Sequence, residues 1–124
     1  MWTSVTIPLV EHLICNHHVA TFRTAISNKE ISTVGNIFVD DTDLATVGFS
    51  PDEPFERILS QAQGTVDTWQ SGLRSTGGDL KWEKCSWGAA DFEWGTNGQW
   101  KYKQLDPTHK LTILNPQGQR VDMK

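Results

Sequence analysis

Three aspartates in the first half of the chain are the residues whose types and spacing could carry out chemistry. Asp40 and Asp41 are adjacent, and Asp43 follows after one intervening residue. Carboxylates held close together on a rigid turn can bind hard divalent cations, which prefer oxygen ligands. Two such cations about 3.5–4 Å apart can activate an attacking hydroxyl and stabilise a leaving phosphate oxygen. The alternative is structural, because aspartate is also common in surface turns.

The sequence around these aspartates predicts a β-hairpin that would position them. Residues 31–39 (ISTVGNIFV) are rich in β-branched and aromatic side chains, which favours a strand. Asp40 and Asp41 then stand at the predicted tip, and a second short apolar run follows at residues 44–47 (LATV). We therefore expect two strands to hold the adjacent carboxylates at one end.

Two helices are expected on either side of this hairpin. Apolar residues recur at roughly helical spacing over residues 8–27, where Pro8 would stand in the first turn. The second helix is expected over residues 50–76, because Ser50-Pro51-Asp52-Glu53 matches a capping box and Gly77-Gly78 is a typical end signal. Its apolar positions recur at steps of three and four and form one stripe: Phe55, Ile58, Leu59, Ala62, Val66, Trp69 and Leu73.

From residue 79 onward the apolar pattern has a period of two, which is typical of strands. Gly95-Thr96-Asn97-Gly98 is a strong turn signal between two aromatic segments. We favour the register that places Trp100 and Tyr102 on the same face as Phe92 and Trp94, because we expect these aromatic side chains to be buried and a slip of one residue would turn them to the other face. A terminal hairpin is expected over residues 110–123. The predicted fold is α+β, an antiparallel sheet with helices packed on one face.

Length and composition limit the class of protein. The chain has 124 residues, 37% of them hydrophobic and 21% charged, which fits one globular domain over residues 1–124. The net charge of −4 is uneven: residues 1–71 carry nine acidic and three basic side chains, whereas residues 72–124 carry six acidic and eight basic ones. No apolar run is long enough for a bilayer, the N-terminus does not resemble a signal peptide, and two cysteines make no disulfide framework. We therefore expect an intracellular protein, in the cytoplasm or the nucleus, without membrane contact.

The order of these motifs, over about residues 30–105, resembles the palm of the reverse transcriptases encoded by retroelements. Phe38-Val39-Asp40-Asp41 resembles the aromatic-x-Asp-Asp hairpin of that family, and an amphipathic helix follows it. Leu80, Lys84 and Cys85 match a later Gly-x-Leu-x-x-x-Lys-Cys-like stretch. The predicted hairpin over residues 92–102 corresponds to the part of the family's palm that grips the primer.

The resemblance implies roles for particular residues in the addition of deoxynucleotides to a primer on an RNA or DNA template. Asp40 would be the main Mg²⁺ ligand of the pair and Asp41 a weaker one, and Lys84 would donate a proton to the departing pyrophosphate. A surface lysine is the alternative for Lys84. Lys101 and Lys103 could lie along a phosphate backbone, and Trp100 could stack on a base. Alternatively, these are solvated lysines and a tryptophan that packs on the sheet.

The chain also departs from the family's pattern. The third catalytic aspartate of the family lies on a strand upstream of the hairpin, but the acidic residues before Asp40 are Glu11 and Glu30. The fingers, the loop that holds the template and the incoming nucleotide, and the thumb have no counterpart in this sequence. We therefore expect the C-terminal part of a palm with an incomplete two-metal site, inactive alone. A sheet edge without its neighbour would favour self-association or pairing with the rest of a polyprotein.

Two other functions and one other metal are alternatives to this interpretation. The chain could be a non-catalytic remnant that binds nucleic acid through its lysines and tryptophans, or a small structural interaction module. Zinc could bind the cluster of His12, Cys15, His17 and His18. Structural zinc sites usually take paired ligands from two segments, so a polar helix face is the favoured interpretation of this cluster.

Overall fold

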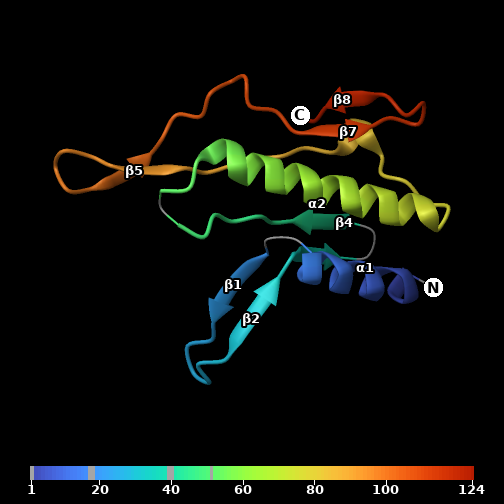
Figure 1. Ribbon diagram of the computed structural model, residues 1–124, viewed down its shortest axis with the longest axis horizontal. Helices are drawn as coiled ribbons and strands as arrows, with labels where there is room; N and C mark the ends of the chain where they lie inside the picture. The colour runs from blue at the N-terminus through green and yellow to red at the C-terminus, as the bar shows by residue number, and fades with distance from the viewer. Residues whose placement is uncertain (1, 17–18, 39–40, 51) are drawn as a thin grey trace. The chain divides into compact units, whose positions relative to one another are not determined.

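The computed structural model describes residues 2–16, 19–38, 41–50 and 52–124 (Figure 1). These residues form two compact units, Met1–Leu80 and Lys81–Lys124, and each is described by itself. The first unit contains α1 (Trp2–Asn16), β1 (Ala20–Arg23), β2 (Glu30–Thr33), β3 (Gly35–Phe38), β4 (Asp41–Leu44) and α2 (Phe55–Ser75). The second contains the short 3₁₀-helix η1 (Trp82–Lys84), β5 (Phe92–Trp94), β6 (Trp100–Tyr102), β7 (Thr112–Leu114) and β8 (Arg120–Asp122).

The mixed helix and antiparallel-strand composition confirms the α+β class at a coarse level. In the part of the chain that the structure describes, however, the strands form four separate two-stranded sheets: β1–β2, β3–β4, β5–β6 and β7–β8. Each pair joins strands that are consecutive along the chain. The one larger sheet that we expected is therefore not formed among the described residues, and the palm architecture stays a proposal.

The helix predicted over residues 8–27 is wrong at both ends. Helix α1 covers Trp2–Asn16, with Pro8 inside it, and β1 begins at Ala20. The segment Ala20–Arg23 carries Thr21 and Phe22, and β-branched and aromatic side chains of this kind favour extended backbone. It pairs with β2, so cross-strand contacts outweigh the approximate helical spacing that suggested one long helix.

A hairpin around the aspartates is confirmed, but both of its strands differ from the expected ones. Strand β4 is Asp41–Leu44 instead of residues 44–47, so Asp41 lies in a strand and not at the tip. The first predicted strand is divided into β2, which ends at Thr33, and β3, which begins at Gly35, where φ is 148°. Strands β3 and β4 pair antiparallel with Phe38 opposite Asp41 and Gly35 opposite Leu44. The two residues between these strands, Val39 and Asp40, lie outside the described residues.

The long helix α2 begins later than predicted and ends close to the predicted place. Pro54 is its N-cap residue and makes no side-chain capping bond, so the predicted capping box does not form. The Glu53 carboxylate instead accepts the backbone N–H of Phe49 at 2.8 Å. At the other end, Gly77 has a φ of 86°, and the N–H of Gly78 donates to the carbonyl of Leu73, as in glycine-terminated helices.

The core of the first unit joins both helices to the β3–β4 hairpin. Leu13 of α1, Trp69 and Leu73 of α2, and Val34 just before β3 are all buried and form one cluster. Half-buried apolar side chains pack against this cluster: Leu9, Val10, Val19, Ile37, Leu44 and Leu80. The predicted apolar stripe of α2 therefore holds the hairpin against the helix through its central and C-terminal turns.

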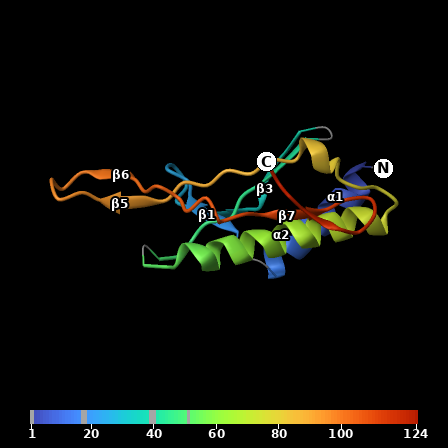
Figure 2. The same ribbon diagram turned by 90° about the horizontal axis from the view of Figure 1, so that it is seen from above.

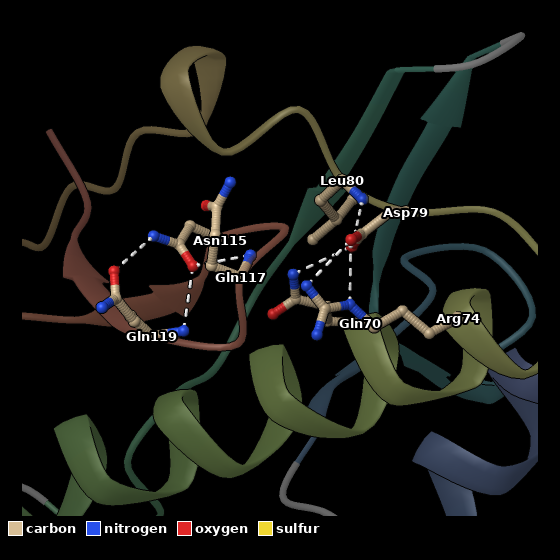
Figure 3. A network of polar contacts seen from close by, with 7 residues as sticks. All are labelled: Gln70, Arg74, Asp79, Leu80, Asn115, Gln117 and Gln119. Carbon is tan, nitrogen blue, oxygen red and sulfur yellow. Dashed lines mark hydrogen bonds and ion pairs between the residues drawn. The ribbon is translucent and has the colours of Figure 1, made fainter.

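The second unit contains the two C-terminal hairpins that the alternating pattern predicted. Strands β5 and β6 run antiparallel (Figure 2), with Phe92 opposite Tyr102 and Trp94 opposite Trp100, which is the favoured register. The turn between β7 and β8 is held by Asn115, whose side-chain oxygen accepts the backbone N–H groups of Gln117 and Gln119 (Figure 3). The prediction of one domain over the whole chain stays a prediction.

Candidate metal and nucleic-acid site

The β3–β4 hairpin has an apolar face and an acidic face. Ile37 and Leu44 share the face that packs against the core cluster. Because side chains alternate along a strand, Asp41 and Asp43 share the opposite face, and both are exposed. Positions two apart on one strand are about 6.6 Å apart. The fold therefore places two carboxylates side by side on a solvent-facing surface.

Gly35 allows this hairpin to form at its inner end. A Cβ atom at this position would overlap the backbone carbonyl oxygen of Asp43, and the φ of 148° is one that residues with side chains rarely adopt. The adjacent backbone is held by Thr33, whose hydroxyl donates to the Gly35 carbonyl at 3.1 Å, and by the Ala45 N–H, which donates to the Val34 carbonyl at 2.7 Å. The acidic strand β4 thus depends on a glycine opposite it.

The carboxylates of the hairpin are suitable ligands for a hard cation, but the described residues supply only a small number of such ligands close together. Asp41 and Asp43 supply only oxygen donors, which suit Mg²⁺. Asp40, the main ligand implied by the resemblance, lies outside the described residues. Among the described residues, no three His, Cys, Asp or Glu side chains form a group able to hold a metal ion. The role of Asp40 and Asp41 in binding Mg²⁺ stays a prediction.

A polar network that we did not anticipate fixes the chain where it leaves α2. The Asp79 carboxylate accepts hydrogen bonds from Gln70 Nε2 at 3.0 Å, from Arg74 Nε at 2.9 Å and from the Leu80 N–H at 2.8 Å (Figure 3). Arg74 also approaches it through Nη2 at 2.8 Å. The hydrogen bond from Arg74 lowers the pKa of Asp79 below its ordinary value of 3.8, and the bonds from Gln70 and Leu80 act in the same direction.

This network has a sequence signal, although a weak one. Gln70 and Arg74 are four residues apart, which places them on one helix face, and Asp79 follows directly after Gly77-Gly78. An acidic residue just after a helix that ends at a glycine can pair with a basic residue in the last turn of that helix. Leu80, whose N–H belongs to the network, packs against the core cluster of the first unit.

Lys84, the predicted proton donor, is the last residue of η1 and is exposed. Its backbone N–H donates to the Lys81 carbonyl at 2.8 Å, and the Cys85 thiol donates to the same carbonyl at 3.5 Å. These contacts form a tight turn that presents the lysine side chain to solvent. Lys84 belongs to the second unit and Asp41 to the first, so each is described within its own unit.

The predicted nucleic-acid contacts on β6 divide between two faces of its hairpin. Trp100 lies on the face of Phe92 and Tyr102, with ring centroids 5.3 Å and 5.7 Å from theirs. Lys101 points to the other face and pairs with Glu93 at 3.1 Å, and Lys103 pairs with Asp91 at 3.4 Å. A nucleic acid that stacks on Trp100 would therefore meet an aromatic surface, and these two lysines are already neutralised by carboxylates.

The cysteine and histidine cluster near the end of α1 is described only in part. His17 and His18 lie outside the described residues, and Cys15 is an exposed free thiol. The Asn16 side chain donates to the His12 carbonyl at 2.8 Å and lies 3.3 Å from His12 Nδ1. Both of these contacts of His12 are with a residue of the same helix. A separate pocket lies between α1 and α2, where His12 and Asp67 are among the lining residues.

No family model, curated protein or solved structure matches this chain. Within the described ranges, neither helix combines the length and the apolar character that a membrane-spanning segment requires. The proposed function therefore depends on the order of the motifs and on the geometry of the hairpin.

Proposed function

We propose that this chain is the C-terminal part of a reverse transcriptase palm, derived from an enzyme that adds deoxynucleotides to a primer on an RNA or DNA template. The observation that carries the proposal is the β3–β4 hairpin. Its apolar face packs on α2, and its opposite face presents Asp41 and Asp43 to solvent directly after the aromatic-x-Asp segment. A catalytic hairpin needs this division, because one face must be anchored while the other meets the substrate.

The elements that follow the hairpin support the same proposal by their order. Helix α2 lies beneath the hairpin, the Asp79 network fixes its exit, and Lys84 and the aromatic β5–β6 hairpin come next. In the reverse transcriptase palm, the catalytic hairpin, the helix, the lysine-containing turn and the primer-gripping hairpin have this order. The resemblance in sequence and the elements of the fold are therefore compatible along about residues 30–105.

The chemistry proposed for the ancestral enzyme is phosphoryl transfer assisted by two Mg²⁺ ions. Such ions lower the pKa of the attacking primer hydroxyl and neutralise charge on the phosphates. Asp40 and Asp41 would hold the metal, with Asp43 on the same exposed face as Asp41. Lys84 would supply a proton to the leaving pyrophosphate. With no upstream aspartate before Asp40, this chain would hold the metal weakly.

The first prediction concerns the carboxylates of the hairpin. Asp41→Asn removes one negative oxygen ligand, so we expect the affinity for Mn²⁺, used as a paramagnetic substitute for Mg²⁺, to fall several-fold. The measurement is Mn²⁺-induced broadening of backbone amide signals, which should be strongest around β4. Asp52→Asn is the matched control, because Asp52 is an exposed aspartate in the turn before α2. Equal broadening in both variants would contradict a metal site on the hairpin.

A further inference from the structure

The β5–β6 hairpin carries an exposed aromatic face in the second unit. Four aromatic side chains share it, with exposed fractions of 53% for Phe92, 76% for Trp94, 57% for Trp100 and 68% for Tyr102. Aromatic side chains are normally buried in a core or an interface, where they contribute most. The exposure of four aromatic rings on two three-residue strands therefore needs a structural or functional explanation.

The aromatic face is continuous. Phe92 contacts Tyr102 across the strands with ring centroids 5.0 Å apart, and it contacts Trp100 edge to face at 5.3 Å. Trp94 stands opposite Trp100 next to the turn and is the most exposed of the four. The ring contacts hold Phe92, Trp100 and Tyr102 in place, so these three side chains have little conformational entropy to lose when a partner covers them.

The opposite face of the same hairpin carries matched charges. Glu93 stands opposite Lys101 and pairs with it, and Asp91 pairs with Lys103 just beyond the strands. These four side chains sum to no net charge. A partner that approaches the aromatic face therefore meets no excess of positive or negative charge on the opposite face of the hairpin. This arrangement does not provide the cations that a polyanion would require.

We propose that this aromatic face is the surface through which two copies of the chain associate. An uncharged aromatic face is complementary to itself, because ring edges can pack on ring faces across a two-fold axis. Two such hairpins would pack face to face about 10 Å apart, as the sheets of a sandwich do.

The available area indicates a weak dimer. With about 150–250 Å² for each aromatic side chain, the exposed parts of the four rings amount to roughly 500 Å² per copy. Two copies would then bury roughly 1,000 Å², which is the lower end of specific interfaces. Association should therefore depend on concentration and be reversible. It does not involve the acidic hairpin, but it uses the β5–β6 hairpin that the proposed function compares with the primer-gripping hairpin, so oligonucleotide binding is tested separately.

The test is sedimentation velocity of the full chain from roughly 10 μM to 1 mM, a range that covers the dissociation constants of weak, reversible dimers. We expect the wild-type chain to shift from monomer to dimer across this range. Trp94→Lys places like charges across the two-fold interface and should weaken association at least tenfold. Glu93→Gln is the matched control: it changes the net charge by the same amount on the opposite face, so it should associate like the wild type.

A second variant and a second measurement separate folding from association. Trp94→Glu carries the opposite charge and should also weaken association at least tenfold. In both variants the amide signals of Asp91 and Lys103 should keep their wild-type positions if the hairpin is folded. In the wild type, concentration-dependent shifts should be largest for the indole N–H signals of Trp94 and Trp100.

Three results would overturn the proposal. One is a wild-type chain that stays monomeric at the highest concentration, and another is a Trp94→Lys variant that is folded and still dimerises like the wild type. The third is a monomeric chain that binds a single-stranded oligonucleotide and loses this binding in Trp94→Ala. The third result would identify the face as a stacking surface for bases instead.

Discussion

At the scale of single residues, Asp41 and Asp43 are exposed because the alternation along β4 turns Thr42 and Leu44 toward the core. Each aspartate is one residue away from a side chain whose partial burial holds the strand in place. The same alternation means that a slip of one residue would bury both carboxylates, at a large cost in desolvation. The acidic face is thus specified by its apolar neighbours as well as by the aspartates themselves.

Gly35 should be intolerant of any side chain. In Gly35→Ala, the new Cβ would overlap the Asp43 carbonyl oxygen at a backbone φ of 148°, so β3 and β4 must separate or shift. We expect a loss of roughly 2 kcal/mol or more in the free energy of unfolding, measured by urea denaturation. Gly88→Ala is the control, because a Cβ there meets no atom within 4 Å. Equal stability of the two variants would contradict the close approach at Gly35.

Asp79 should make stability depend on pH in the acidic range. The hydrogen bond from Arg74 lowers its pKa in the folded state below 3.8, so the charged form stabilises the fold above that value. This stabilisation is lost as the pH falls through the lowered pKa. We expect Asp79→Asn to cost about 1 kcal/mol at neutral pH, a modest value because the pair is partly exposed.

The measurement for Asp79 is the free energy of unfolding of both chains between about pH 7 and pH 2, because the network titrates within that range. The difference between wild type and Asp79→Asn should be constant at the upper end and shrink below pH 3.8. A difference that grows as the pH falls would have the wrong sign for a carboxyl group with a lowered pKa.

At the scale of elements, the sequence predicts those features that depend on interactions between neighbouring residues. The apolar stripe of α2, its glycine end, the aspartate hairpin and the register of β5–β6 could all be read from neighbouring residues. Helix α1 and strand β1 could not, because the preference of Thr21 and Phe22 for extended backbone competes with an approximate helical spacing. The start of α2 was misplaced because a second proline, Pro54, competes with the capping signal at Ser50.

The elements that long-range contacts determine were harder to predict. The sequence indicates antiparallel strands. Pairing between strands of different hairpins, however, depends on contacts between residues that are distant in the sequence. The aromatic face of β5–β6 shows this clearly. Its register was predicted on the assumption that Trp100 and Tyr102 would be buried, whereas the register is correct and the rings are exposed.

Trp69 should be the residue on which the packing of α2 most depends. It is 1% exposed in the cluster that joins both helices to the hairpin, so Trp69→Ala should cost about 3–5 kcal/mol in the free energy of unfolding. Trp69→Phe should retain much of the stability, because the indole N–H has no hydrogen-bond partner among the described residues. Thermal and urea unfolding measure both variants.

The control for Trp69 is Trp94→Ala, which removes a side chain of the same type that is 76% exposed. Measured at a concentration where the chain is monomeric, it should change stability by about 0.5 kcal/mol or less. A cost for Trp69→Ala as small as this would show that the cluster does not hold α2.

At the scale of the whole molecule, the uneven charge of the sequence follows the division into two units. Residues 1–80 carry ten acidic and four basic side chains, whereas residues 81–124 carry five acidic and seven basic ones. Three of those seven, Lys101, Lys103 and Lys110, already pair with carboxylates. The basic excess of the second unit therefore depends on its other cations. Lys81 and Lys84, which precede the aromatic hairpin, are the lysines to test first for contact with phosphates.

The central claim is that Asp40 and Asp41 belong to a polymerase hairpin that meets the end of a primer. Because the chain has no aspartate before Asp40, we expect no primer extension by the chain alone. Its hairpin should still bring a divalent metal close to a bound primer terminus. Fe²⁺ can occupy sites that contain carboxylates. With added hydrogen peroxide, bound Fe²⁺ is oxidised to Fe³⁺ and the peroxide is reduced to hydroxide and a hydroxyl radical, which cuts nucleic acid nearby.

The most direct measurement is therefore Fe²⁺-dependent cleavage of an end-labelled primer–template by the full chain. We predict cuts concentrated at the primer 3′ end, which disappear in Asp40→Asn and Asp41→Asn and persist in Asp52→Asn. Cleavage spread evenly along the duplex, or cleavage at the primer end that survives both hairpin substitutions, would contradict the assignment of this hairpin to a reverse transcriptase palm.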